Sequence, residues 1–133
     1  MPKRISDVSL HVYVTPEILD RVVAAVRRVV DDHVAHRDLS AWRFTLPVDP
    51  DRPAHTLLES QWRQDNPGAD PGDRRTYEIA LSLVGEQEDL TEADLDALER
   101  RLVLRISAAD AVPYSIHALF HDSFDLEENH ERI

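Results

Sequence analysis

The chain has 133 residues, of which 26 are acidic and 15 are basic, giving a formal net charge of −11 at pH 7. This length fits one domain with a single hydrophobic core. The negative charge repels phosphate backbones, which disfavours general binding to nucleic acid, so no nucleic-acid partner is expected. The absence of cysteine excludes disulfides and thiolate chemistry. No run of 18 apolar residues occurs, so we expect no membrane helix and a cytoplasmic protein.

The first predicted element is a strand over residues 7–14, where apolar and polar side chains alternate with the period of a strand that buries one face. Thr15 then offers an N-cap oxygen, and Pro16 suits the first helical position because its missing N–H costs nothing there. Apolar residues recur every three or four positions from Ile18 to Val34, which outlines the buried stripe of a helix.

A second strand is predicted over residues 41–48, again from alternation. Its apolar set is Trp42, Phe44, Leu46 and Val48, and its polar set is Arg43 and Thr45. We expect Trp42 and Phe44 to face the same helices as the apolar residues of the first strand, because a half-buried strand usually buries its apolar side.

A long excursion, residues 49–75, follows where a short hairpin is usual. Such an excursion is uncommon inside a compact domain and tends to be functional or mobile. Its middle, residues 54–63, is predicted to form a short helix that presents Leu57, Leu58 and Trp62. Trp62 either folds back over the sheet or projects as an anchor for a partner, because tryptophan is enriched at interface hot spots.

Two more strands are predicted from alternation over residues 77–84 and 115–121, the first of them ended by Gly85. Between them a helix begins at Thr91, which forms a pair with Asp94 that resembles a capping box. Its start is therefore well specified by local residues.

The elements follow the order β-α-β-β-α-β, which predicts an α+β, ferredoxin-like fold. Right-handed crossovers give a four-stranded antiparallel sheet in the order 4-1-3-2, with both helices on one face. We predict a single domain over residues 1–123 and an acidic C-terminal tail over residues 124–133. The almost exclusive use of arginine over lysine is typical of a GC-rich bacterial genome.

The sheet face away from the helices is the best candidate for a functional site. It is predicted to carry polar side chains from all four strands, among them His11, Tyr13, Arg43, Glu78 and His117. A histidine near a carboxylate and a tyrosine can move protons or bind a polar ligand. The alternative is an ordinary polar face that contacts solvent or a second copy of the chain, since antiparallel sheets often leave one face uncovered. This alternative is the stronger one.

Metal binding is not expected. Residues four apart on a strand are separated by roughly 13 Å, so His117 and His121 cannot share one ion. His33 and His36 could do so from one turn of a helix, with Asp32 nearby, but histidines in a last helical turn are also favoured by the helix dipole. The sequence likewise contains no glycine-rich phosphate loop and no nucleophile motif, so no cofactor is expected.

These observations predict a small, non-catalytic interaction or regulatory module that is dimeric and acts through the polar sheet face and the excursion. A protein partner with a basic surface suits the acidic charge. The alternative is a small-molecule enzyme of the isomerase or cyclase type, with His11 as general base in a cavity between sheet and excursion. The position of residues 54–63 discriminates between the two, because an enzyme needs them to form the roof of a pocket.

Overall fold

The computed structural model describes residues 3–109 and 112–122. In this part of the chain the elements are β1 (Lys3–Val14), α1 (Pro16–Ala35), β2 (Leu39–Pro47), α2 (Pro53–Asp65), β3 (Arg75–Glu86), a short 3-10 helix (Gln87–Asp89), α3 (Glu92–Ala109) and β4 (Tyr114–Asp122). The predicted 124–133 tail lies outside the described residues.

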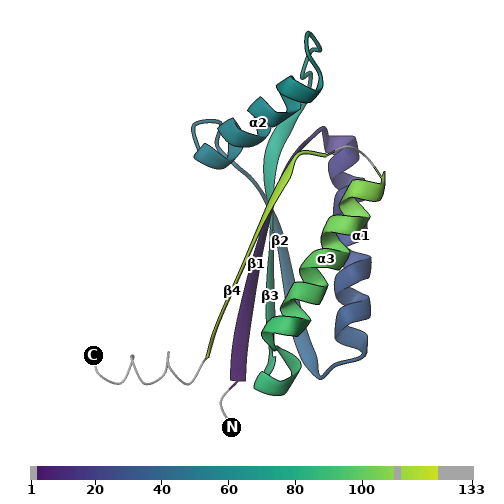
Figure 1. The fold of residues 1–133 in the computed structure, drawn as a ribbon, viewed down its shortest axis with the longest axis vertical. Coiled ribbons are helices and arrows are strands. Elements are labelled where there is room, and N and C mark those ends of the chain that lie inside the picture. Colours follow the sequence, from purple (N-terminus) through teal and green to yellow (C-terminus); the bar gives the residue numbers. More distant parts are fainter. Residues whose placement is uncertain (1–2, 110–111, 123–133) are drawn as a thin grey trace, which may run out of the picture.

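The four strands form one antiparallel sheet in the order β2-β3-β1-β4, which is the predicted order read from the other edge. Helices α1 and α3 lie together on one side of this sheet, and α2 lies at one end of the other side (Figure 1). The structure thus confirms an α+β fold built on a four-stranded antiparallel sheet, with a third helix inserted between β2 and β3. We call the side away from α1 and α3 the open face.

The two long helices begin at the predicted capping residues. The Thr15 hydroxyl oxygen accepts a hydrogen bond from the backbone N–H of Ile18 at 3.3 Å, with Pro16 at the first helical position. The Thr91 hydroxyl oxygen likewise accepts from the N–H of Asp94 at 3.1 Å and donates to the Asp94 carboxylate at 2.9 Å. Each cap satisfies a backbone donor that has no partner inside its helix.

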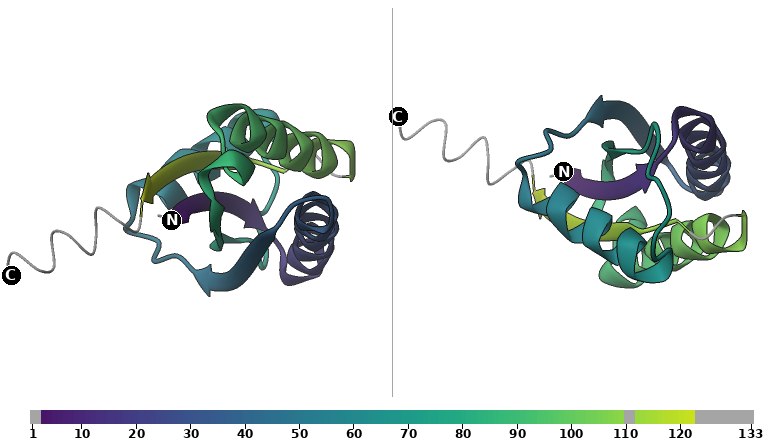
Figure 2. Two further views of the ribbon diagram at one scale, coloured as in Figure 1. Left: turned by 90° about the horizontal axis from the view of Figure 1, so that it is seen from below. Right: turned by 90° about the horizontal axis from the view of Figure 1, so that it is seen from above.

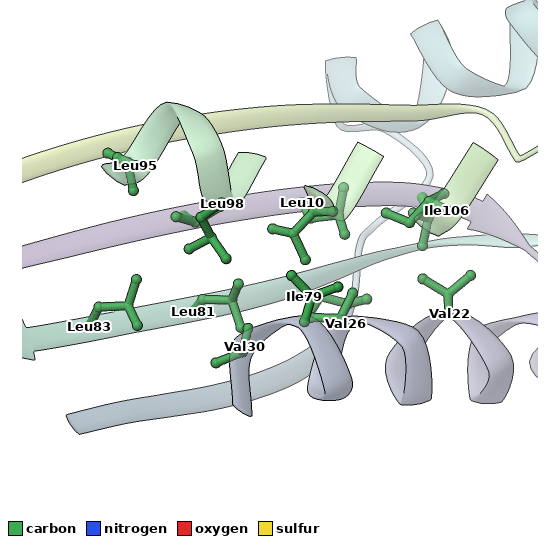
Figure 3. Packing of buried hydrophobic residues seen from close by; sticks show 14 of the residues in the cluster. Leu10, Val22, Val26, Val30, Ile79, Leu81, Leu83, Leu95, Leu98 and Ile106 are labelled. Atoms are coloured by element: carbon green, nitrogen blue, oxygen red, sulfur yellow. The ribbon is translucent and has the colours of Figure 1, made fainter. Parts of the chain in front are cut away.

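The main core lies between the sheet and the helix pair α1 and α3 (Figure 3). Leu10 and Ile79 from the central strands meet Val26 of α1 and Leu98 of α3, and each of the four is at most 1% exposed. Burying a side chain of this size contributes about 1.5 to 3 kcal/mol, so this layer holds the helices on the sheet.

The predicted orientation of β2 is wrong. The apolar residues Trp42, Phe44 and Leu46 pair with Ser82, Ala80 and Glu78 of β3, which lie on the open face. Residues at odd positions of β2 therefore face the helix side instead. Strand alternation separates the two faces but does not say which one is buried, because a shift of one residue exchanges them.

Leu39, which lies before the predicted start of this strand, fixes that choice. It pairs with Gly85 and packs against the main core, so every second residue after it also faces the helix side. Gly85 does not end β3 as predicted, because the strand continues to Glu86. A side chain at Gly85 would overlap Leu39, so glycine here makes room for the first residue of β2.

Candidate functional site

Helix α2 covers one end of the open face through a small apolar cluster of its own. Leu58 and Trp62 of α2 pack on Tyr13 of β1, and all three are 5% exposed or less. The rings of Tyr13 and Trp62 meet edge to face at 6.1 Å, and the guanidinium of Arg74 lies 4.5 Å from the centre of the Trp62 ring. Trp62 therefore folds back onto the sheet, and it does not project from it.

A polar network fastens α2 to β3 beside this cluster. His55 Nδ1 lies 2.8 Å from the Thr76 hydroxyl oxygen, and His55 Nε2 lies 3.2 Å from the Glu59 carboxylate. This order of carboxylate, imidazole and hydroxyl is that of a nucleophilic triad. Thr76 is only 1% exposed, however, so its oxygen is closed to a substrate and the network serves to hold the helix.

Tyr13 is shielded by the same helix. Burial raises the pKa of its phenol above the ordinary value, and the neighbouring Glu59 carboxylate adds to the increase. The phenol stays protonated at neutral pH. It cannot act there as a general base.

His11 and Glu78 are neighbours across β1 and β3 on the part of the open face next to α2. His11 Nε2 lies 3.9 Å from the Glu78 carboxylate, which also accepts a 2.5 Å hydrogen bond from the Ser9 hydroxyl. His11 Nδ1 is buried and has no hydrogen-bond partner among the described residues. The serine and the histidine thus hold the carboxylate in place at the edge of α2.

A cavity of about 500 Å³ opens at this pair. Its walls come from β1, β3, the end of β2 and the start of α2, and they include His11, Leu46, Pro47, Val48, Asp49, Arg52, Pro53, Ala54 and Glu78. Five of the nine wall residues are apolar, and the other four, His11, Asp49, Arg52 and Glu78, carry ionisable groups. A hollow in which several polar groups converge is a candidate site for a small polar ligand.

A row of large apolar side chains lies along the outer edge of the open face. We call Trp42, Phe44 and Leu46 the apolar strip; they are 51%, 61% and 52% exposed. They lie on β2, which is an edge strand, and α2 packs on the other three strands (Figure 2). Contiguous exposed apolar side chains of this size mark interaction surfaces.

The structure brings together only some of the predicted site residues. His11 and Glu78 are adjacent. His117 of β4 lies on the same face, opposite Ser9 of β1, and its side chain is exposed. Tyr13 and Trp62 contact each other, but beneath α2 and away from the surface.

Arg43 is misplaced in the prediction. It pairs with Leu81, a core residue, and so lies on the helix side of the sheet, away from His11. The reason is the orientation of β2 set by Leu39. Sequence reasoning correspondingly missed the apolar strip as a surface, and it missed His55 and Glu59, whose i, i+4 spacing in the expected 54–63 helix was the available signal.

No group of three or more histidine, aspartate or glutamate side chains in residues 3–109 and 112–122 is arranged to hold a metal ion. His33 is 2% exposed, whereas His36 is exposed and lies 3.7 Å from Asp32. The two histidines considered from sequence therefore differ in environment. Within the same residues, no helix is both long and apolar enough to cross a membrane.

No known family model matches the sequence, and no curated protein matches it. Several solved structures do match the fold of this chain. The de novo designed protein Foldit4 has a TM-score of 0.51 at 8% identity, with 88% of this chain and 96% of that chain covered. An identity this low shows likeness of fold alone.

Two natural structures match with lower TM-scores. The C-terminal domain of the MgtC protein from Mycobacterium tuberculosis has a TM-score of 0.46 at 15% identity over 88% of each chain. A hydantoinase/carbamoylase family amidase from Burkholderia ambifaria has a TM-score of 0.49 at 17% identity, over 88% of this chain but only 27% of the amidase. Neither bears on the function of this chain.

Proposed function

We propose that the chain is a small, non-catalytic interaction module that binds a protein partner through the apolar strip and the adjacent open face. In this proposal the module has a ferredoxin-like fold and acts in the cytoplasm. The single observation that carries the proposal is the exposure of Trp42, Phe44 and Leu46 in one row. An aromatic residue left half exposed in water costs the monomer hydrophobic free energy that a bound partner recovers.

Charge supports a partner with a basic surface. The chain carries a net charge of −11, and the open face beside the strip contributes Glu78 and Asp7. Opposite charge across an interface steers encounter and speeds association, and this steering weakens as salt rises. Binding of the partner is therefore expected to weaken with increasing ionic strength.

The test compares three forms of the full chain as bait in a lysate of the source cells. These are the native sequence, a strip variant (Trp42→Ser, Phe44→Ser, Leu46→Ser) and a control variant (Leu57→Ser, Leu104→Ser) that changes exposed apolar residues elsewhere. A protein retained by the native and control baits but not by the strip variant, and then bound as a pure protein in calorimetry, supports the proposal. Equal retention by all three baits, or by none, contradicts it.

The cavity favours a second function, the binding of a small molecule. Residues 53–65 lie over one end of the open face and leave a hollow of about 500 Å³ with His11 and Glu78 in its wall. An imidazole beside a fixed carboxylate can also transfer a proton, which is the role of His11 in the isomerase or cyclase alternative.

This second function is tested by screening a library of small polar metabolites for shifts in amide resonances. Ligands of the cavity perturb residues around His11, and they lose affinity in His11→Ala and Glu78→Ala but keep it in His117→Ala. The last variant removes an exposed histidine of the same face that does not line the cavity. A library without a single cavity ligand would remove this function.

A further inference from the structure

Strand β2 is an edge strand with little protection. Its outer edge pairs with no other strand in the described residues, and all its residues from Ala41 to Pro47 are exposed on both faces. Natural proteins usually shield such edges with lysines, bulges, prolines or a covering helix. Here the only proline is Pro47, at the last position of the strand, and no lysine occurs.

The strand is also free of the charge that dominates the rest of the chain. Of the four strands, only β2 contains no aspartate or glutamate, although the chain has 26 of them. Its single charged residue is Arg43. Interface cores are typically depleted in acidic residues and lysine and enriched in aromatics and arginine, which is the composition found here.

We infer that two copies of the chain pair antiparallel through their β2 edges, about a twofold axis at Phe44, to form a continuous eight-stranded sheet. In this register Phe44 faces Phe44 of the second copy. Trp42 faces Leu46 of the second copy, and the reverse pair follows by symmetry. The two apolar strips thus meet along the centre of the joined open faces, aromatic against aromatic and aromatic against leucine.

The pattern of side chains favours this register over one with its axis at Arg43. On the helix side of the sheet, an axis at Phe44 places Arg43 opposite Thr45 of the second copy, so the two arginines do not face each other. An axis at Arg43 would oppose the two arginines directly and would leave Leu46 opposite Ser40. Like charges opposite each other across two strands are destabilising, and apolar cross-strand pairs are stabilising. The strand is therefore more complementary to itself with the axis at Phe44 than with the axis at Arg43.

Dimer formation through β2 is a second interaction, distinct from the proposed binding of a partner. Its dependence on salt concentration is the opposite of that expected for partner binding. Two copies with a net charge of −11 repel each other at a distance, so screening by salt favours the dimer. Binding of a basic partner weakens under the same change. A chain that dimerises without binding a partner, or binds one as a monomer, would separate the two proposals.

The natural absence of cysteine allows a direct test of the register. Full-length single-cysteine variants Arg43→Cys, Phe44→Cys and Thr45→Cys are oxidised and assayed for covalent dimer, with Leu57→Cys as an exposed control away from β2. Directly opposed residues have Cα atoms about 4.5 to 5.5 Å apart, within the range of a disulfide. The self-pairs at positions 43 and 45 would be roughly 8 Å apart by strand geometry.

Dimer formation that is fast and nearly complete for Phe44→Cys, and slow for the other three variants, is the expected result. Fastest crosslinking at position 43 overturns the register, and equal crosslinking at all four positions overturns edge pairing.

The uncrosslinked native chain provides a second readout. Light scattering should report twice the 15.2 kDa mass of one chain, with more dimer at 0.5 M than at 0.05 M sodium chloride. Phe44→Lys places two like charges on the axis and should yield a monomer, whereas in Leu46→Lys each lysine faces Trp42 of the second copy and the dimer should be weakened less. Circular dichroism of both variants checks that they are folded. A native chain that is monomeric at both salt concentrations refutes the inference.

Discussion

Leu39 lies directly over the backbone of Gly85, on the helix side of the sheet. A Cβ atom added at Gly85 would overlap the end of the Leu39 side chain and would lie 3.0 Å from the carbonyl oxygen of Asp38. This one contact sets the orientation of β2, and through it the side of the sheet on which the apolar strip is exposed.

Replacing Gly85 with alanine is expected to destabilise the protein by about 1 to 2 kcal/mol, because Leu39 must leave its place against the core to make room. The gain in backbone rigidity on losing a glycine offsets part of this cost. Urea unfolding followed by circular dichroism measures the free energy of unfolding of the variant against the native chain.

A double-mutant cycle with Leu39→Ala tests the cause. If the overlap is responsible, Gly85→Ala should cost much less when Leu39 is already truncated. Additive costs in the cycle would show that Gly85 is needed for another reason.

Trp62→Ala is expected to release α2 from the sheet while the main core stays folded. Truncating a buried aromatic costs about 3 to 5 kcal/mol, and Trp62 belongs to a cluster of three residues that is separate from that core. Amide hydrogen exchange should show lost protection over residues 53–65 and retained protection in β1 and α3. Leu57→Ala, in the exposed face of the same helix, should leave exchange unchanged. Global unfolding of Trp62→Ala would mean that α2 is part of the main cooperative unit.

Thr76→Val is expected to loosen the same helix by a polar mechanism. The substitution keeps the shape of the buried side chain but removes the hydroxyl that lies 2.8 Å from His55 Nδ1, at a cost of about 1 to 3 kcal/mol. Hydrogen exchange over α2 measures the effect. Adding His55→Phe to the valine variant removes the ring nitrogen left without a partner and should restore part of the protection; no restoration would argue against the network as an anchor.

His33 makes the stability of the protein depend on pH. Burial lowers the pKa of its imidazole below the ordinary 6.5, and the charge of Arg37 lowers it further, while Asp94 opposes the shift. The folded state then binds a proton less readily than the unfolded state. The contribution of His33 to stability is therefore complete above about pH 6.5 and is lost as the pH decreases from there toward the lower pKa of the folded state.

His33→Gln should flatten this fall between about pH 7 and pH 5, where Asp32 and Asp94, whose pKa values are held below 3.8, do not titrate. Urea midpoints at each pH provide the measurement. Leu57→Ser, which changes an exposed side chain that does not titrate, is the control and should keep the native slope. An unchanged slope in His33→Gln would assign the pH dependence to another group.

Local signals in the sequence were sufficient for much of the fold. Thr15 with Pro16, and Thr91 with Asp94, define helix starts by contacts within a few residues of each other, and the structure contains those contacts. The alternation in β1 and β3 identified the buried face correctly, because both strands are central and bury their apolar side against the helices.

The errors arose where the outcome depends on residues far apart in the chain. The face of β2 is decided by the contact of Leu39 with Gly85, which neither segment reveals alone. The same holds for Tyr13, which reads as a surface residue of a polar face until α2 is known to dock on it. His11 and Glu78 could be placed together because their pairing follows from strand order and register alone.

The insertion of α2 between β2 and β3 has a consequence for the order of folding. The two strands are neighbours in the sheet, yet the whole 48–74 segment must loop back before they can pair, and closing a long loop costs more chain entropy than closing a tight hairpin. Strand β1 pairs with β3 over twelve residue pairs, whereas β2 pairs with β3 over nine. Pairing of β2 with β3 is therefore slower than pairing through a tight hairpin would be, which delays completion of the sheet edge that carries Trp42 and Phe44.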